Sequence, residues 1–171
     1  MMKTESWTEF SIGQIKRIRI PTDWLKVEQN NPDLSSLVVF HPPSNPMVQL
    51  GFYYRGRPLS QSIGEAFQSL LSADARDLTP SQLTPIAAVL DDVFSIEQFH
   101  LAGASVQNIS GRNVLAVKGR WLSTENESYE IFIDAGRTGT VVQQVYFVAP
   151  ASEFVQYIDA VMESINALEW S

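Results

Sequence analysis

The sequence contains no cysteine and only two histidines. The chain therefore cannot form disulfide bonds, use a thiolate nucleophile, or hold zinc or an iron–sulfur cluster through cysteine. A zinc site would need His41 and His100 together with a carboxylate, but the two histidines lie in distant segments without the spacing of a ligand motif. No Gly-x-Ser-x-Gly sequence points to a nucleophilic serine. We expect two structural histidines, no catalytic residue, no metal and no cofactor.

Long apolar runs are also absent. A membrane-spanning helix needs about 18 or more consecutive apolar residues, and no stretch of the chain approaches that length. Residues 1–14 lack the apolar core of a signal peptide. Together with the lack of cysteine, which fits a reducing compartment, these absences predict a cytoplasmic protein without a membrane span.

Basic residues are few. The 12 lysines and arginines are outnumbered by 19 aspartates and glutamates, which gives a net charge of −7. Because affinity for nucleic acids rests largely on neutralising phosphates, this balance argues against a nucleic-acid partner. A chain of 171 residues is long enough for one domain with a core of its own. Since it contains no internal repeat and no linker, we predict a single domain over residues 1–171.

The centre of the chain is rich in β-branched and aromatic residues. Three such stretches, residues 113–122, 128–134 and 140–148, are separated by two short polar loops, a pattern typical of consecutive hairpins. If both hairpins close symmetrically, Arg120 faces Glu130, and Glu130 faces Gln144. The second loop is glycine-rich, but a strand follows it where a phosphate-binding loop needs a helix, so we predict a plain turn.

The pattern of the other segments predicts how this sheet is covered. Residues of both parities in the third stretch are apolar, so both faces of the sheet should be buried. Two segments, residues 60–72 and 150–168, have the apolar stripe of a helix lying on a sheet. One helical turn is expected at 80–83 and a short helix at 85–90. Residues 30–33 have the composition of a turn. Further strands are predicted at the residues listed here: 7–10, 14–20, 37–40, 47–55 and 95–109.

Hairpins join most neighbouring strands, so the sheet should be mostly antiparallel. The helices from the middle and from the end of the chain should lie on its opposite faces. We therefore predict an α+β fold, a three-layer α/β/α sandwich on a mostly antiparallel sheet.

Several acidic pairs have simple structural interpretations. Asp91 and Asp92 would end a short helix, although acidic groups there oppose the helix dipole, which leaves a functional role open. Glu127 and Glu130 are better explained as cross-strand partners of Lys118 and Arg120 than as a catalytic pair.

Residues 52–57, Phe-Tyr-Tyr-Arg-Gly-Arg, combine aromatic rings with two arginines in an otherwise acidic chain. Tyrosine and arginine are enriched at the energetic centres of protein interfaces. We predict that Tyr53, Tyr54, Arg55 and Arg57 form a binding surface. The alternative is that the rings of one parity belong to the core and the arginines are solvated.

The chain resembles PsbP-like proteins in its order of elements and in a short Ile-Pro-x-x-Trp stretch, Ile20-Pro21-Thr22-Asp23-Trp24. A closing amphipathic helix that ends in Ser164-Ile165 and Glu169-Trp170 adds to the likeness. The resemblance implies the α/β/α sandwich that PsbP-like proteins share with the Ran-binding nuclear import factor and with bacterial DcrB-type proteins, a binding fold without shared catalytic residues. Photosynthetic members carry lumen-targeting segments and many DcrB-type proteins are exported, whereas this chain shows no such segment.

These observations leave three hypotheses for function. The first is a non-enzymatic cytoplasmic protein that binds another protein, whose identity the sequence does not reveal. The second is a small-molecule-binding protein or enzyme with an apolar pocket between the sheet and its helices, to which His100 or Arg120 would contribute. The third is a homo-oligomer that forms through an edge strand.

Overall fold

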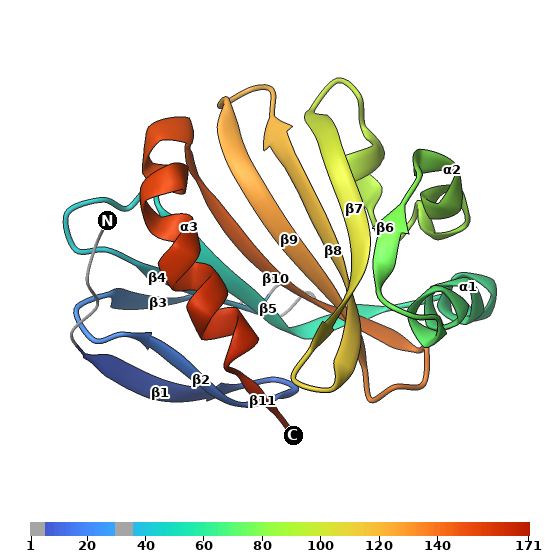
Figure 1. Cartoon of the computed structure of the whole chain (residues 1–171), viewed down its shortest axis with the longest axis horizontal. Helices are drawn as coiled ribbons and strands as arrows, with labels where there is room; N and C mark the ends of the chain where they lie inside the picture. Colours follow the sequence, from blue (N-terminus) through green and yellow to red (C-terminus); the bar gives the residue numbers. More distant parts are fainter. Residues whose placement is uncertain (1–5, 30–35) are drawn as a thin grey trace.

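The computed structural model describes residues 6–29 and 36–171, and the turn predicted at residues 30–33 lies outside this part. Within it, the strands form an eight-stranded and a three-stranded antiparallel sheet (Figure 1). The larger sheet has the order β3-β4-β5-β10-β9-β8-β7-β6. Its strands, in chain order, are β3 (Leu25–Gln29), β4 (Leu37–His41), β5 (Gln49–Pro58), β6 (Arg76–Leu78), β7 (Phe99–Ile109), β8 (Arg112–Trp121), β9 (Asn126–Ala135) and β10 (Val141–Pro150).

The smaller sheet joins the two ends of the described chain. β2 (Ile15–Pro21) lies between β1 (Trp7–Ile12) and β11 (Glu169–Trp170), so the last strand pairs with the second. An ion pair between Arg17 and Glu169 reinforces this contact at the surface. The sequence pattern predicts the β1–β2 hairpin, but not the strand that the C-terminus adds to it.

In the described residues, three α-helices and two 3₁₀-helices accompany the sheets. They are α1 (Gln61–Ser72), α2 (Pro80–Leu83), η1 (Thr84–Ile86), η2 (Asp91–Phe94) and α3 (Ala151–Asn166). None of the helices in the described ranges is both long and apolar enough to span a membrane. The short helix expected at 85–90 is a 3₁₀-helix over Thr84–Ile86 followed by hydrogen-bonded turns, such as Val89 N–H to the Ile86 carbonyl at 2.9 Å.

The large sheet is covered on both faces, as the sequence predicts. Along β8, Val114 and Ala116 pack into one core cluster with α3 and the small sheet, and we call this side the α3 face. Leu115 and Val117 pack into a second cluster with α1 and the segment from residue 83 to 93, and we call this side the α1 face. The α/β/α sandwich is therefore confirmed, and the three-stranded sheet is an addition to its α3 layer (Figure 1).

The predicted cross-strand pairings of Arg120 with Glu130 and of Glu130 with Gln144 are both wrong, and Gln144 lies opposite Phe132. Arg120 lies opposite Glu127, and Glu130 lies opposite Val117 on β8 and Tyr146 on β10. The loop after β8 is tighter than expected and contains Glu125 in the left-handed region, with φ of 59°. Because this shifts the register by an odd number of residues, Glu130 moves to the opposite face of the sheet from Arg120.

Candidate functional site

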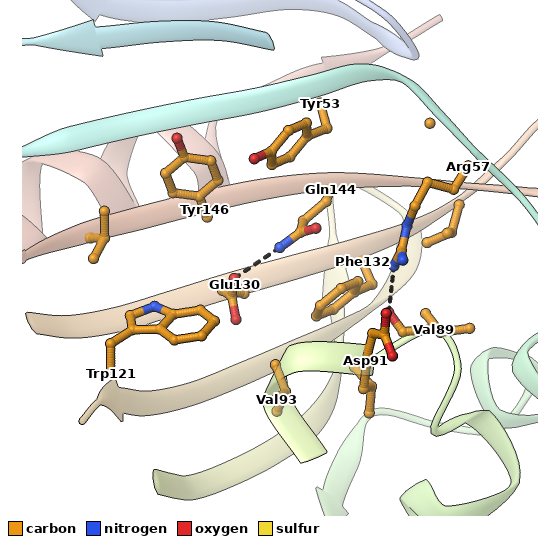
Figure 2. A pocket seen from close by; sticks show the side chains of 14 residues that line it. Tyr53, Arg57, Val89, Asp91, Val93, Trp121, Glu130, Phe132, Gln144 and Tyr146 are labelled. Carbon is orange, nitrogen blue, oxygen red and sulfur yellow. Dashed lines mark hydrogen bonds between the residues drawn. The ribbon is translucent and has the colours of Figure 1, made fainter. Parts of the chain in front are cut away.

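A pocket of about 350 Å³ opens on the α1 face, between the sheet and the segment that leads into η2 (Figure 2). Four strands and this segment supply its walls. The residues that line it are Tyr53, Gly56 and Arg57 of β5; Val89, Leu90, Asp91 and Val93 around η2; Trp121 of β8; Glu130 and Phe132 of β9; and Val142, Gln144, Tyr146 and Val148 of β10. Its volume lies within the roughly 300–1,000 Å³ that small-molecule sites occupy.

An irregularity between β5 and β10 shapes one side of the pocket. Tyr54, Arg55 and Gly56 lie opposite the single residue Gln143, so β5 bulges outward there. Gly56 permits the bend because its φ of 75° belongs to the left-handed region. Tyr53 and Arg57 flank the bulge, and both line the pocket.

Arg57 ties the sheet to the η2 segment. Its guanidinium donates a hydrogen bond to the backbone carbonyl of Val89 at 2.8 Å, as the dashed line beside Val89 in Figure 2 shows. Asp91, the first residue of η2, is exposed where it borders the pocket. Asp91 and Asp92 therefore begin a 3₁₀-helix and do not end a helix, which corrects the sequence-based interpretation.

A carboxylate lies in the floor of the pocket. Glu130 is only 4% exposed, and its Oε1 accepts a hydrogen bond from Nε2 of Gln144 at 2.8 Å. Burial raises the pKa of the neighbouring Tyr146 phenol, and the nearness of Tyr53 and Glu130 raises it further. Tyr146 is therefore a neutral phenol at physiological pH, able to donate a hydrogen bond.

Aromatic rings surround this floor. The rings of Tyr53 and Tyr146 lie 5.8 Å apart between centroids, and Figure 2 shows Trp121 beside Glu130 on the other side. Trp121 is held in an edge contact with Phe99, with 4.9 Å between ring centroids. The pocket thus combines apolar walls with a few convergent polar groups, which is the usual composition of a ligand site.

The structure divides the predicted binding residues Tyr53, Tyr54, Arg55 and Arg57 between two places. Tyr53 and Arg57 line the pocket. Tyr54 packs against the core of the α3 face, and its carbonyl accepts a hydrogen bond from the Gln143 side chain at 2.5 Å. Arg55 is exposed and does not line the pocket. The four side chains therefore do not form one surface.

Neither histidine contributes to the pocket. His100 and Arg120 lie opposite each other on β7 and β8 and are both exposed, so the expectation that one of them lines the pocket is wrong. His41 lies at the end of β4, where its Nδ1 is 2.8 Å from the carbonyl oxygen of Pro42. No group of three or more metal-ligating side chains occurs in the part of the chain that the structure describes.

Sequence reasoning missed most of the pocket, including Glu130, Gln144, Tyr146 and Trp121. A signal for two of them existed. Glu130 and Gln144 are polar residues within strands whose two faces are predicted to be buried, and a buried polar side chain requires a partner or a function. The odd register shift concealed that signal, because it made Glu130 look like the surface partner of Arg120.

No protein-family model and no curated protein matches this chain. Its fold, however, is similar to solved structures. The solution structure of cyanobacterial PsbP (CyanoP) from Synechocystis sp. PCC 6803 aligns with a TM-score of 0.60 over 97% of this chain and 93% of that chain, at 9% identity. The chain has the PsbP-like fold. This agrees with the resemblance found in the sequence.

Two further structures share the PsbP-like fold with this chain. PA94 from Pseudomonas aeruginosa, a protein of unknown function described as a putative regulator, aligns with a TM-score of 0.54 and 16% identity over 96% of this chain and 97% of that chain. LpqN from Mycobacterium tuberculosis, involved in cell envelope biogenesis, aligns with a TM-score of 0.50 and 15% identity over 95% of this chain and 89% of that chain. At these identities the likeness concerns the fold and not the function.

Proposed function

We propose that this protein binds a small organic molecule in the pocket between β5, β10 and η2, without transforming it. The observation that carries the proposal is a pocket of about 350 Å³ in which apolar walls meet the polar side chains of Tyr53, Glu130, Gln144 and Tyr146. Polar groups placed this way fix the orientation of a ligand, while the apolar walls supply affinity. If side chains had filled the space between the sheet and the helices, this function would have been contradicted.

The chemistry of the lining supports binding over catalysis. The 14 residues that line the pocket include no serine, histidine or lysine. The lining therefore does not contain a serine or lysine nucleophile activated by a neighbouring histidine. Burial raises the pKa of the Tyr146 phenol, whereas the most effective acid–base catalysts at neutral pH have a pKa near 7. The polar groups instead form a fixed hydrogen-bonding surface.

A screen of small fragments by ¹H–¹⁵N NMR tests this proposal. Bound fragments should shift the resonances of Tyr53, Gln144 and Tyr146 and the indole of Trp121. Val148, half-buried in the lining, is suited to blocking the pocket, and Val148→Phe should weaken fragment binding about tenfold or more. Val155→Phe makes the same change at a position that is 75% exposed on α3 and should have no effect. Fragment binding that is equal in both variants, or absent from the wild type, would contradict the proposal.

A protein partner is the second candidate, and β3 favours it. This edge strand has all five residues exposed, with Leu25 at 49% and Val27 at 42%. An exposed apolar edge strand can accept a further strand, from a partner or from a second copy of the chain. Val27→Lys should then abolish a complex seen by light scattering. A monomer mass for the wild type would exclude the second copy.

The cytoplasm is the compartment we propose for either function, as the sequence predicts. Fractionation of source cells tests it.

A further inference from the structure

The pocket places a negative side chain among electron-rich rings. Glu130 is 4% exposed in its floor, and Trp121, Tyr53 and Tyr146 stand around it in Figure 2. Asp91 adds a second carboxylate at the border of the same pocket. The basic residue of the lining, Arg57, directs its guanidinium at the Val89 carbonyl on the η2 side.

We infer that the ligand of this pocket is a small organic cation, an amine whose ammonium group lies beside Glu130 and whose apolar part lies among Trp121, Phe132 and Val148. This inference rests on the proposed function, since it names the class of ligand that the same pocket takes.

The first reason is the cost of burying a charge. Burying a carboxylate costs hydration, and the hydrogen bond from the Gln144 amide at 2.8 Å is one of the interactions that offset this cost without adding a positive charge. An ammonium ligand supplies the opposite charge and strong charge-assisted hydrogen bonds. An anionic ligand would instead be repelled by Glu130 and by Asp91.

The second reason is the kind of wall. The faces of tryptophan and tyrosine rings carry negative electrostatic potential and attract cations within about 6 Å. Tyr53 and Tyr146, 5.8 Å apart, leave their rings on one side of the Glu130 carboxylate, and Trp121 lies on another. A ligand head group beside Glu130 therefore meets a carboxylate and aromatic rings together, which favours a cation over a neutral group of the same size.

The experiment compares three probes that share one phenylethyl skeleton and differ in charge: phenethylammonium, phenethyl alcohol and hydrocinnamate. Their affinities for the full chain are measured by NMR titration at neutral pH, with the indole signal of Trp121 as a local reporter. Phenethylammonium should bind about tenfold or more tightly than the alcohol, and hydrocinnamate more weakly than either.

Two variants make the same chemical change at different places. Glu130→Gln should remove the preference for phenethylammonium over the alcohol. Glu163→Gln, at an exposed position of α3, should change neither affinity. The charge series on the wild-type chain decides the inference even if Glu130→Gln does not fold.

The outcomes separate this inference from the proposed function. If all three probes bind the pocket equally, or hydrocinnamate binds most tightly, the pocket is a ligand site and the inference of a cation is overturned. If none of the probes shifts the lining resonances although fragments from the screen do, the inference of a cation is overturned and the proposed function stands; if neither does, both are contradicted. Tighter binding of the cation that persists in Glu130→Gln also overturns the role given to this carboxylate.

Discussion

The ring of Tyr146 lies directly against the backbone of Gly51, its cross-strand partner between β10 and β5. A Cβ on residue 51 would lie 2.3 Å from two carbons of that ring, well inside van der Waals contact. A glycine inside a strand often marks a bulge or a close approach, and at Gly51 the structure shows close approach in an unbroken register. The missing side chain is therefore what allows Tyr146 to lie along the sheet at the edge of the pocket.

Gly51→Ala should consequently disturb both stability and the pocket. The new methyl group must displace the Tyr146 ring, and overpacking of this kind costs about 1–3 kcal/mol of unfolding free energy. Urea denaturation measures this loss, and fragment titration should show weaker binding. Gly103→Ala is the matched control, because a Cβ there has no atom within 4 Å. Equal effects of the two substitutions would refute the importance of the Gly51–Tyr146 contact.

Gly64 of α1 makes a similar contact with the turn between β9 and β10. A Cβ on Gly64 would lie 1.8 Å from the carbonyl oxygen of Gly139. Replacing glycine by alanine inside a helix normally stabilises by about 1 kcal/mol. Here we expect the opposite sign, a loss of about 1–3 kcal/mol by chemical denaturation, because the helix must move off the turn. Ser69→Ala, at an exposed position of the same helix, should be neutral or slightly stabilising.

Stability at alkaline pH should depend on Tyr146. Burial raises the pKa of its phenol above the ordinary 10.0, so above pH 10 the unfolded chain loses the proton that the folded chain keeps. The free energy of unfolding therefore decreases as the pH rises beyond 10. Tyr146→Phe should remove part of that decrease in urea titrations between pH 8 and about 11. Part should remain, since burial also raises the pKa of Tyr129. Parallel pH profiles of variant and wild type would rule out this role for Tyr146.

Arg112 anchors the C-terminal strand. Its buried guanidinium donates to the Asp134 carbonyl and lies over the Trp170 ring, 5.1 Å from the centroid. Arg112→Met keeps much of the apolar stem but removes the charged donor to the Asp134 carbonyl and the cation above the Trp170 ring, so we expect a loss of about 1–3 kcal/mol in thermal or urea unfolding. Arg120→Met, at an exposed position of β8, the strand that also contains Arg112, should change the free energy of unfolding by less than about 0.5 kcal/mol. Comparable losses would show that Arg112 acts as an ordinary surface residue.

Much of the fold can be predicted from local patterns. Apolar residues of both parities in β8 and β10 require a sheet buried on two sides, and the stripes of α1 and α3 supply the covering helices. The turn chemistry between β9 and β10 is also readable, since Gly136 and Gly139 take positive φ there, and Asp134 accepts a hydrogen bond from the Gly139 N–H at 2.8 Å. Each of these features depends on residues that are close together in the chain.

The candidate site escapes such reasoning because distant segments make it. The sequence predicts Tyr53 and Arg57 as binding residues, but the partners of Tyr53 in the pocket come from β9 and β10. The Arg57–Val89 hydrogen bond joins β5 to the segment before η2. The two turns that set the register of β9 each contain a residue other than glycine at positive φ, Glu125 and Arg137, which composition does not predict. A change of one residue in such a turn reverses the face of every side chain on the strand.

The sequence by itself determined the class of this protein: an α/β/α sandwich, without the thiols or histidine motifs of metal and redox chemistry. Only the tertiary structure decided that Glu130 lies in a pocket and not beside Arg120 on the surface. The physical reason is that the fold class follows from the apolar pattern of whole strands, which tolerates local irregularities. The pocket instead depends on one odd register shift between β8 and β9, one bulge at Gly56, and the position of the 3₁₀-helix η2.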